Sequence, residues 1–296
     1  MPNKNRPSSG FIKDQIALCS PAPADHDLTL VIPAYNEESR LPRTLEELSR
    51  YLCDWGVDFR VVVVDDGSRD NTANVARAFD GRYSTIRQPN GGKGSAVRNG
   101  ILAATGRIVA FTDADLPYDL SALKTAYDVI HAQQSDVVFG SRDLSESASL
   151  VERRFLRTVA SAMFRHIVTV LVSREVRDTQ CGLKIFSRAA AQAIFSRATI
   201  DGFAFDAETV FLAHCLRLRI RKVPVTLVND YASTISLTRN AIPMLIDVLR
   251  VRWRAIRGRY DLGIPSHPGM ETFQADQSSE NTSDCGHQIN DRSAIS

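Results

Sequence analysis

Short runs of apolar residues, each ended by polar or turn-forming residues, recur along most of the chain. Such runs, rich in Val, Ile and Phe and apolar on both faces, are typical of buried strands in a parallel sheet. We predict strands over residues 28–32, 59–64, 85–87, 108–111, 136–142 and 222–228.

Between these runs, apolar residues recur three and four positions apart, which indicates amphipathic helices. The clearest pattern is a leucine series, Leu41, Leu45, Leu48 and Leu52. Further helices are expected to end near residue 79 and to cover residues 120–133, 152–173, 189–197 and 206–216. Another should follow the glycine-rich stretch 89–95, with Val97, Ile101 and Leu102 on its inner side. This alternation of strands and helices predicts an α/β fold, a mostly parallel sheet flanked by helices.

The last predicted helix covers residues 242–257, because Asn240 and Pro243 form a helix-start signal. Its apolar positions form one stripe: Ile242, Leu245, Ile246, Leu249, Trp253 and Ile256. Five arginines between positions 250 and 259 flank that stripe. The competing interpretation is that the stripe packs into the protein's own core.

Four segments follow from the composition along the chain. A flexible leader is expected over 1–26, one α/β domain over 27–240, the basic amphipathic helix over 241–262 and a disordered tail over 263–296.

Overall composition narrows the class of protein. A net charge of +2 over 296 residues does not suit a general nucleic-acid binder. The five cysteines form no CxxC pair, which argues against a zinc site or a disulfide framework and fits the reducing cytosol. No apolar stretch reaches the roughly 20 residues that a membrane-spanning helix needs, so none is predicted.

Asp113 and Asp115 directly follow the predicted strand 108–111. In open α/β sheets, ligands bind at the carboxyl ends of the strands. Two carboxylates there can hold a divalent cation, which in turn can hold a diphosphate. The structural alternative is that Asp113 caps a turn and Asp115 caps the next helix.

The stretch 89–95 contains three glycines before the start of a predicted helix. Glycine lets a backbone approach a ligand closely, and a helix start favours anions. A simple glycine turn explains the stretch equally well. It matches neither the Walker A spacing nor GxGxxG, which disfavours nucleoside triphosphatases and dehydrogenases.

Four short segments, taken in their order along the chain, resemble motifs of glycosyltransferase family 2, whose members have the GT-A fold. The matching segments are 31–37 (VIPAYNE), 63–68 (VVDDGS), 92–94 (GKG) and 113–115 (DAD). Three more resemble the dolichyl-phosphate β-glucosyltransferase branch: 140–142 (GSR), 177–184 (RDTQCGLK) and 203–208 (FAFDAE). The resemblance covers roughly residues 28–258 and places the α/β domain within a GT-A glycosyltransferase.

The resemblance implies a set of donor-site residues. Pro33, Tyr35 and Glu37 would line the base and ribose of a nucleotide sugar. Asp65 or Asp66 would accept a hydrogen bond from the base, and Lys93 would lie near the nucleotide end of the donor. Asp113 and Asp115 would hold Mg²⁺ or Mn²⁺ on the diphosphate and so serve catalysis.

The acceptor side is implied in the same way. Arg142, together with Arg153 or Arg154, would bind phosphate groups, and Gln180, Asp206 and Glu208 would shape the sugar and acceptor side. Ser233 would contact the acceptor phosphate, although the branch usually carries a Gly-Ser-Lys cluster there. Alternatively, the arginines are solvated surface charges, and Asp206 and Glu208 merely complement a helix dipole.

The implied activity is metal-dependent, inverting transfer of a hexose, glucose from UDP-glucose, onto a polyprenyl or dolichyl phosphate. Such an acceptor is already ionised, so it needs no general base. The enzyme would be cytoplasmic and peripheral on the inner membrane surface, because the N-terminal anchor of the eukaryotic branch has no counterpart here. The alternatives are a GDP-mannose donor, a soluble phosphorylated acceptor, or a non-catalytic nucleotide-sugar-binding protein.

Overall fold

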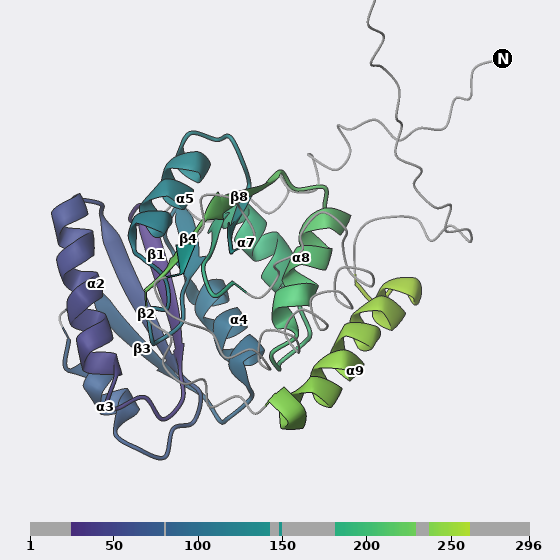
Figure 1. Cartoon of the computed structure of the whole chain (residues 1–296), viewed down its shortest axis with the longest axis horizontal. Helices are drawn as coiled ribbons and strands as arrows, with labels where there is room; N and C mark the ends of the chain where they lie inside the picture. The colour runs from purple at the N-terminus through teal and green to yellow at the C-terminus, as the bar shows by residue number, and fades with distance from the viewer. Residues whose placement is uncertain (1–24, 80, 143–147, 150–180, 229–236, 261–296) are drawn as a thin grey trace, which may run out of the picture. The chain divides into compact units, whose positions relative to one another are not determined.

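The computed structural model describes residues 25–79, 81–142, 148–149, 181–228 and 237–260, with the backbone alone for 148–149, 237–245 and 248. Within that part of the chain, seven strands form one sheet in the order β3-β2-β1-β4-β7-β5-β8. They are β1 (Leu28–Ala34), β2 (Phe59–Asp65), β3 (Tyr83–Arg87), β4 (Ile108–Phe111), β5 (Val137–Ser141), β7 (Lys184–Ser187) and β8 (Ile220–Pro224). The predicted mostly parallel sheet is confirmed (Figure 1).

Helices cover both faces of the sheet (Figure 1). They are α2 (Leu41–Trp55), α3 (Thr72–Arg77), α4 (Lys93–Ala103), α5 (Ser121–His131), α7 (Arg188–Phe195), α8 (Phe205–Cys215) and α9 (Leu237–Ile256). Helices α2 and α5 share one apolar cluster with the sheet, and α4, α7 and α8 share the other.

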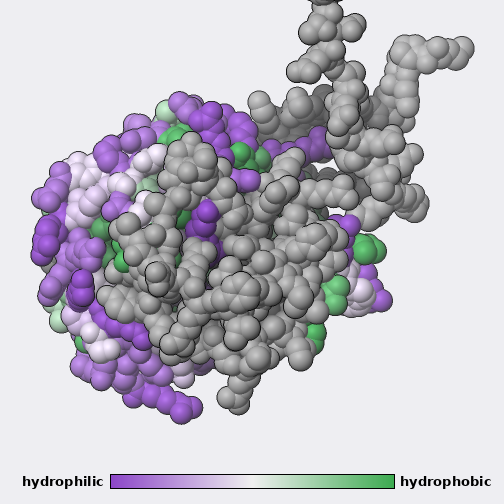
Figure 2. All heavy atoms as spheres, in the orientation of Figure 1, coloured by the Kyte–Doolittle hydropathy of each residue, from purple (hydrophilic) through white to green (hydrophobic). Residues whose placement is uncertain are grey.

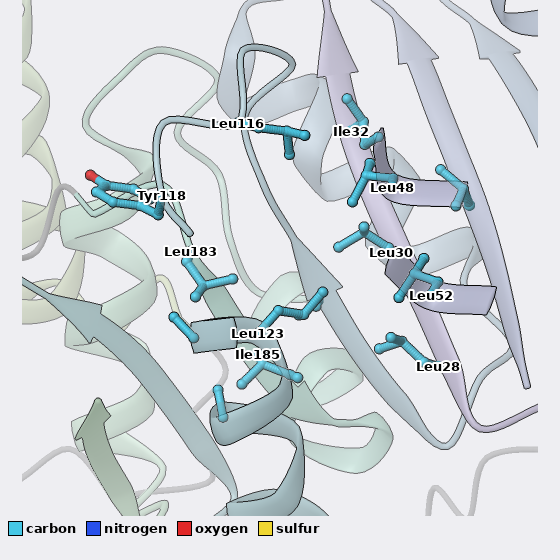
Figure 3. Close-up of a cluster of buried hydrophobic side chains, with 14 of the residues drawn as sticks. Leu28, Leu30, Ile32, Leu48, Leu52, Leu116, Tyr118, Leu123, Leu183 and Ile185 are labelled. Atoms are coloured by element: carbon cyan, nitrogen blue, oxygen red, sulfur yellow. The ribbon is translucent and has the colours of Figure 1, made fainter. Parts of the chain in front are cut away.

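Strand β1 shows why its sequence is apolar throughout. Leu28, Leu30 and Ile32 point towards Leu48 and Leu52 of α2 (Figure 3), whereas Val31 belongs to the cluster on the opposite face. Alternate side chains of a strand face opposite sides, so a strand covered on both faces buries every position. The leucine series of α2 is fully buried, as its spacing predicted.

Strand β7 was not predicted; it begins at Lys184, the last residue of the segment 177–184 that resembles the glycosyltransferase branch. It lies antiparallel between β4 and β5, so the sheet is mixed. A lysine opens this four-residue strand, and a charged residue at a buried position hides the apolar pattern on which strand prediction rests.

Three further details differ from prediction. The expected strand 222–228 is divided between β8 and β9 (Thr226–Leu227), and β9 pairs with β6 (Ala148–Ser149) in a second sheet. Leu102 is exposed rather than on the inner side of α4. Helix α9 begins at Leu237, five residues before the predicted start at residue 242.

Some predicted segments lie outside the described residues. They are the helix 152–173, residues 1–24 of the leader and the tail 263–296.

Gly100 sets how closely α4 approaches the sheet. A methyl group on its Cα would collide with Cγ1 of Val31 and lie 2.8 Å from Cγ2 of Val64. Valine side chains are stiff at χ1, so the helix itself must move.

We therefore expect Gly100→Ala to lower the free energy of unfolding by about 1–3 kcal/mol, despite alanine's better helix propensity. Gly81→Ala is the matched control, because no atom lies near an added methyl group there. Urea denaturation measures both variants, and equal transition midpoints would contradict the close-packing argument.

Candidate active site

Asp113 and Asp115 lie in the turn that leaves the carboxyl end of β4, as the sequence predicted. Leu116 closes this turn with a positive φ of 42°, an uncommon conformation for a branched side chain, and its N–H donates to the Asp113 carbonyl. Gly182 lies against Asp113 so closely that a side chain there would strike the carboxylate. The backbone therefore fixes the acid pair from two sides.

Lys93, the first residue of α4, meets this acid pair. Its Nζ lies 2.5 Å from Oδ1 of Asp113. Burial lowers the pKa of Lys93, but Asp113 and Asp206 outweigh that effect and raise the pKa above its ordinary value. Burial, and then the neighbouring Asp113, raise the pKa of Asp115. The site thus gathers charges of both signs in a partly desolvated space.

A second lysine–aspartate pair lies behind the first. Lys184 of β7 is fully buried, and its Nζ bonds to Asp206 and donates to the Cys181 carbonyl at 2.8 Å. The ammonium group also faces the rings of Phe111 and Phe139. Burial raises the pKa of Asp206, although Lys184 and Lys93 both act to lower it. Lys184 was not predicted as a site residue.

The glycine-rich stretch is held by internal hydrogen bonds. The Asp66 carboxylate accepts from the amides of Gly91 and Gly92 at 2.8 and 2.9 Å. The Asp201 carbonyl accepts from the amides of Gly94 and Ser95 at 2.7 and 3.2 Å. These four amides therefore have protein acceptors, which favours the simple structural turn over an anion cradle. The turn presents Lys93.

Asp65 and Asp66 are both buried. Asp65 accepts from the Ser68 amide at 2.9 Å and pairs with Arg87 at 3.2 Å. Together with the bonds of Asp66, these contacts fix the loop after β2 against the start of α4. The predicted hydrogen bond to a nucleotide base would have to share those carboxylates.

The loop after β1 carries the other predicted donor residues. Pro33 is buried in β1, and Tyr35 is exposed. Glu37 pairs with Arg40 at 3.3 Å, and its amide donates to Thr72 Oγ1 at 2.8 Å. Burial raises the pKa of Glu37 while Arg40 opposes this, and the charges of Asp115 and Asp113 act on the same carboxyl. Glu37 thus lies within electrostatic range of the acid pair.

The acceptor-side predictions have a different outcome. Arg142 directly follows β5 and is half-buried. Glu208 is fully buried with internal partners on both oxygens, so it does not line the site as an open carboxylate. Outside the described residues lie Gln180, Arg153, Arg154 and Ser233.

The acid pair fits a divalent cation. Oδ1 of Asp115 is buried and has no hydrogen-bond partner within the described part of the chain. An orphaned carboxylate oxygen is costly unless a cation or water meets it, and Mg²⁺ and Mn²⁺ prefer such oxygens. No cluster of three or more His, Cys, Asp or Glu side chains suited to a metal occurs among the described residues. A cation here would therefore need ligands from a bound substrate or water.

Helix α9 presents an exposed apolar face (Figure 2 shows green spheres among purple ones at its position). The large apolar side chains exposed on α9 are Ile246, Leu249, Trp253 and Ile256. The guanidinium of Arg257 lies 3.9 Å from the centre of the Trp253 ring, and that of Arg259 lies 5.4 Å from it. No helix in the described ranges is both long and apolar enough to cross a membrane.

Comparison with known proteins places the chain in a family. The profile of Glycosyl transferase family 2 matches residues 29–195. The chain is 32% identical over 246 residues to the dolichyl-phosphate beta-glucosyltransferase of Dictyostelium discoideum, across 78% of this chain and 75% of that protein. The human dolichyl-phosphate beta-glucosyltransferase is 32% identical over 252 residues, 79% and 78% of the two chains.

Solved structures share the fold. Mycobacterium tuberculosis glucosyl-3-phosphoglycerate synthase in complex with Mn²⁺, UDP and phosphoglyceric acid has a TM-score of 0.59 at 18% identity, over 89% of this chain and 86% of that one. For mannosyl-3-phosphoglycerate synthase from Rubrobacter xylanophilus the TM-score is 0.57 at 17% identity, over 90% and 83%. The predicted GT-A fold is thereby confirmed. The chain belongs to glycosyl transferase family 2 and is a nucleotide-sugar-dependent glycosyltransferase.

Proposed function

We propose that this enzyme transfers glucose from UDP-glucose to dolichyl phosphate or another polyprenyl phosphate, with inversion at the sugar carbon. The observation that carries the proposal is the acid pair at the end of β4 with Lys93 against it, in a chain whose relatives are dolichyl-phosphate beta-glucosyltransferases. The use of UDP with Mn²⁺ or Mg²⁺ by structural neighbours supports the choice of donor and cation.

Asp113 and Asp115 would hold Mg²⁺ or Mn²⁺, which supplies positive charge to the diphosphate that leaves the sugar. Lys93, paired with Asp113, would add a second positive charge beside that diphosphate. The base and ribose would be surrounded by Pro33, Tyr35, Glu37 and Asp66. Asp65 would support the loop after β2 through its bonds to Ser68 and Arg87.

The acceptor phosphate is an oxyanion at neutral pH, so it can attack the sugar carbon without losing a proton. Arg142, Arg153, Arg154 and Ser233 would orient it. Asp206, held by Lys184, and Gln180 would receive the sugar hydroxyls. The nucleophile and the leaving group occupy opposite sides of the carbon, which inverts its configuration.

The neighbours with phosphorylated three-carbon acceptors give a second candidate, in which the same donor site serves a soluble phosphorylated acceptor. UDP-glucose and GDP-mannose, each offered alone with a short polyprenyl phosphate or 3-phosphoglycerate, test both donor and acceptor. The donor that yields product identifies the sugar, and the product mass tells a lipid acceptor from a soluble one.

We further propose that the enzyme works at the cytoplasmic surface of a membrane, attached through α9. Its exposed apolar side chains and stacked arginines suit the boundary between acyl chains and anionic headgroups. A lipid-phosphate acceptor requires such an approach, because the phosphate lies at that boundary.

Replacing one carboxylate should abolish transfer. We expect Asp115→Ala to reduce the transfer rate at least about 100-fold, the scale of one strong transition-state contact. It should also weaken Mn²⁺ binding measured by electron paramagnetic resonance. Asp128→Ala removes an exposed acid of α5 as the control. Near-parental activity of Asp115→Ala at saturating metal would refute the metal assignment.

Membrane attachment should depend on the arginines stacked on Trp253. Each basic residue near an anionic surface adds about 1 kcal/mol, so Arg257→Gln/Arg259→Gln should weaken binding to phosphatidylserine vesicles about 30-fold. Vesicle co-sedimentation measures this.

The control Arg50→Gln/Arg77→Gln removes the same charge from α2 and α3. Arg254 is left in place, because it donates to Thr199. Equal sedimentation of the two double variants would exclude this end of α9 as the attachment site.

A further inference from the structure

Glu208 of α8 is a fully buried carboxylate whose four hydrogen-bond donors converge on it. Its Oε2 accepts from the amides of Thr199 and Ile200 at 2.9 and 2.8 Å. Its Oε1 accepts from the hydroxyls of Thr199 and Tyr260 at 2.8 and 2.6 Å. A buried charge is tolerated when donors saturate it in this way, and each partner is then held firmly in place.

Tyr260 reaches Glu208 because of the turn that ends α9. Gly258 has a positive φ of 62°, and the amides of Gly258 and Arg259 donate to the carbonyls of Ala255 and Arg254. This is the Schellman pattern, which favours glycine at that position. The turn sends Tyr260 back into the core, where its ring packs against Phe211.

Burial raises the pKa of the Tyr260 hydroxyl, and the neighbouring Glu208 carboxylate raises it further. Tyr260 therefore remains a protonated donor over the physiological range. Arg254, in the last turn of α9, donates to Thr199 Oγ1. The end of α9 is thus joined to the 199–201 segment at two places.

The same segment supports the start of α4. The Asp201 carbonyl accepts from the amides of Gly94 and Ser95, and the Asp201 carboxylate pairs with Arg98 at 2.6 Å. A methyl group on Gly94 would lie 2.5 Å from the Ile200 carbonyl oxygen. Lys93 directly precedes Gly94, so the position of its backbone depends on residues 199–201.

We propose that Glu208 and Tyr260 are positioning residues, through which the end of α9 fixes the position of Lys93, the donor-binding lysine. The path runs from the Tyr260 hydroxyl to Glu208, then through the amides of Thr199 and Ile200 to Asp201 and the first turn of α4. Its effect on donor affinity rests on the proposed function; its effect on the first turn of α4 does not.

The test is Tyr260→Phe, which keeps the ring against Phe211 and removes one hydroxyl. Tyr83→Phe is the matched control, because the Tyr83 hydroxyl bonds to Ser49 and the Leu45 carbonyl on α2 instead. Amide hydrogen exchange should accelerate about fivefold at Gly94, Ser95 and Ile200 in Tyr260→Phe, the effect of one lost hydrogen bond. The control should leave these amides unchanged.

Donor binding provides the second readout. UDP with Mn²⁺ should bind Tyr260→Phe about fivefold more weakly, and the KM for donor should rise while kcat changes little. Glu208→Gln alone should keep a near-parental UDP affinity and KM for donor. The glutamine carbonyl can accept hydrogen bonds from both backbone amides, and its amide group can donate to both hydroxyls. Glu208→Ala should show the larger loss of UDP affinity; if it fails to fold, Tyr260→Phe decides.

The outcomes separate the two proposals. Faster exchange in the first turn of α4 without UDP binding by parent or variant would support the positioning role and refute the proposed function. Parental exchange and parental UDP affinity in Tyr260→Phe would overturn the positioning role while the proposed function stands.

Discussion

Two lysine–aspartate pairs at the carboxyl end of β4, Lys93–Asp113 and Lys184–Asp206, are the interaction on which the rest of the site depends. Removing a charged lysine from water costs free energy. Lys184 can therefore stay buried only while Asp206 and the Cys181 carbonyl accept hydrogen bonds from its ammonium group. That requirement fixes β7 between β4 and β5. It also holds the turn that carries Gly182 against the acid pair.

The loops gain their geometry from neighbours distant in sequence rather than from their own conformational preferences. Asp66 and the Asp201 carbonyl between them occupy the first amides around α4, which converts a flexible glycine-rich stretch into a fixed support for Lys93. The support reaches as far as Tyr260, because Glu208 joins residues 199–200 to the end of α9. The end of α9 is thereby connected to the start of α4.

Prediction succeeded where one physical signal dominates a segment. Continuous apolar runs identified β1, β2 and β4, and the leucine spacing identified α2, because strands buried on both faces are mostly apolar and a buried helix face repeats its apolar residues at helical spacing. It failed at β7, since a buried lysine looks like a surface residue until its partner is known. The two-residue strands β6 and β9 are too short to show any period.

The site was predictable in outline and not in detail. The positions of Asp113 and Asp115 follow from their place after a strand, which local sequence records. The internal bonds of Asp66 and Glu208 depend on partners tens of residues away, and no spacing rule reports them. A motif shows that a carboxylate matters; it does not show whether the carboxylate meets a ligand or a backbone amide.

Charge arithmetic links the two lysine–aspartate pairs to substrate binding. Three carboxylates, Asp113, Asp115 and Asp206, face two ammonium groups, Lys93 and Lys184, and the neighbouring charges act on the pKa values of Lys93, Asp115 and Asp206. With all five groups ionised the cluster would carry one net negative charge, and a divalent cation alone would leave one positive charge in a partly buried space. The diphosphate of a nucleotide sugar carries two negative charges, so without a cation it would add to the negative charge of this partly buried space, and a divalent cation bound beside it would offset that charge.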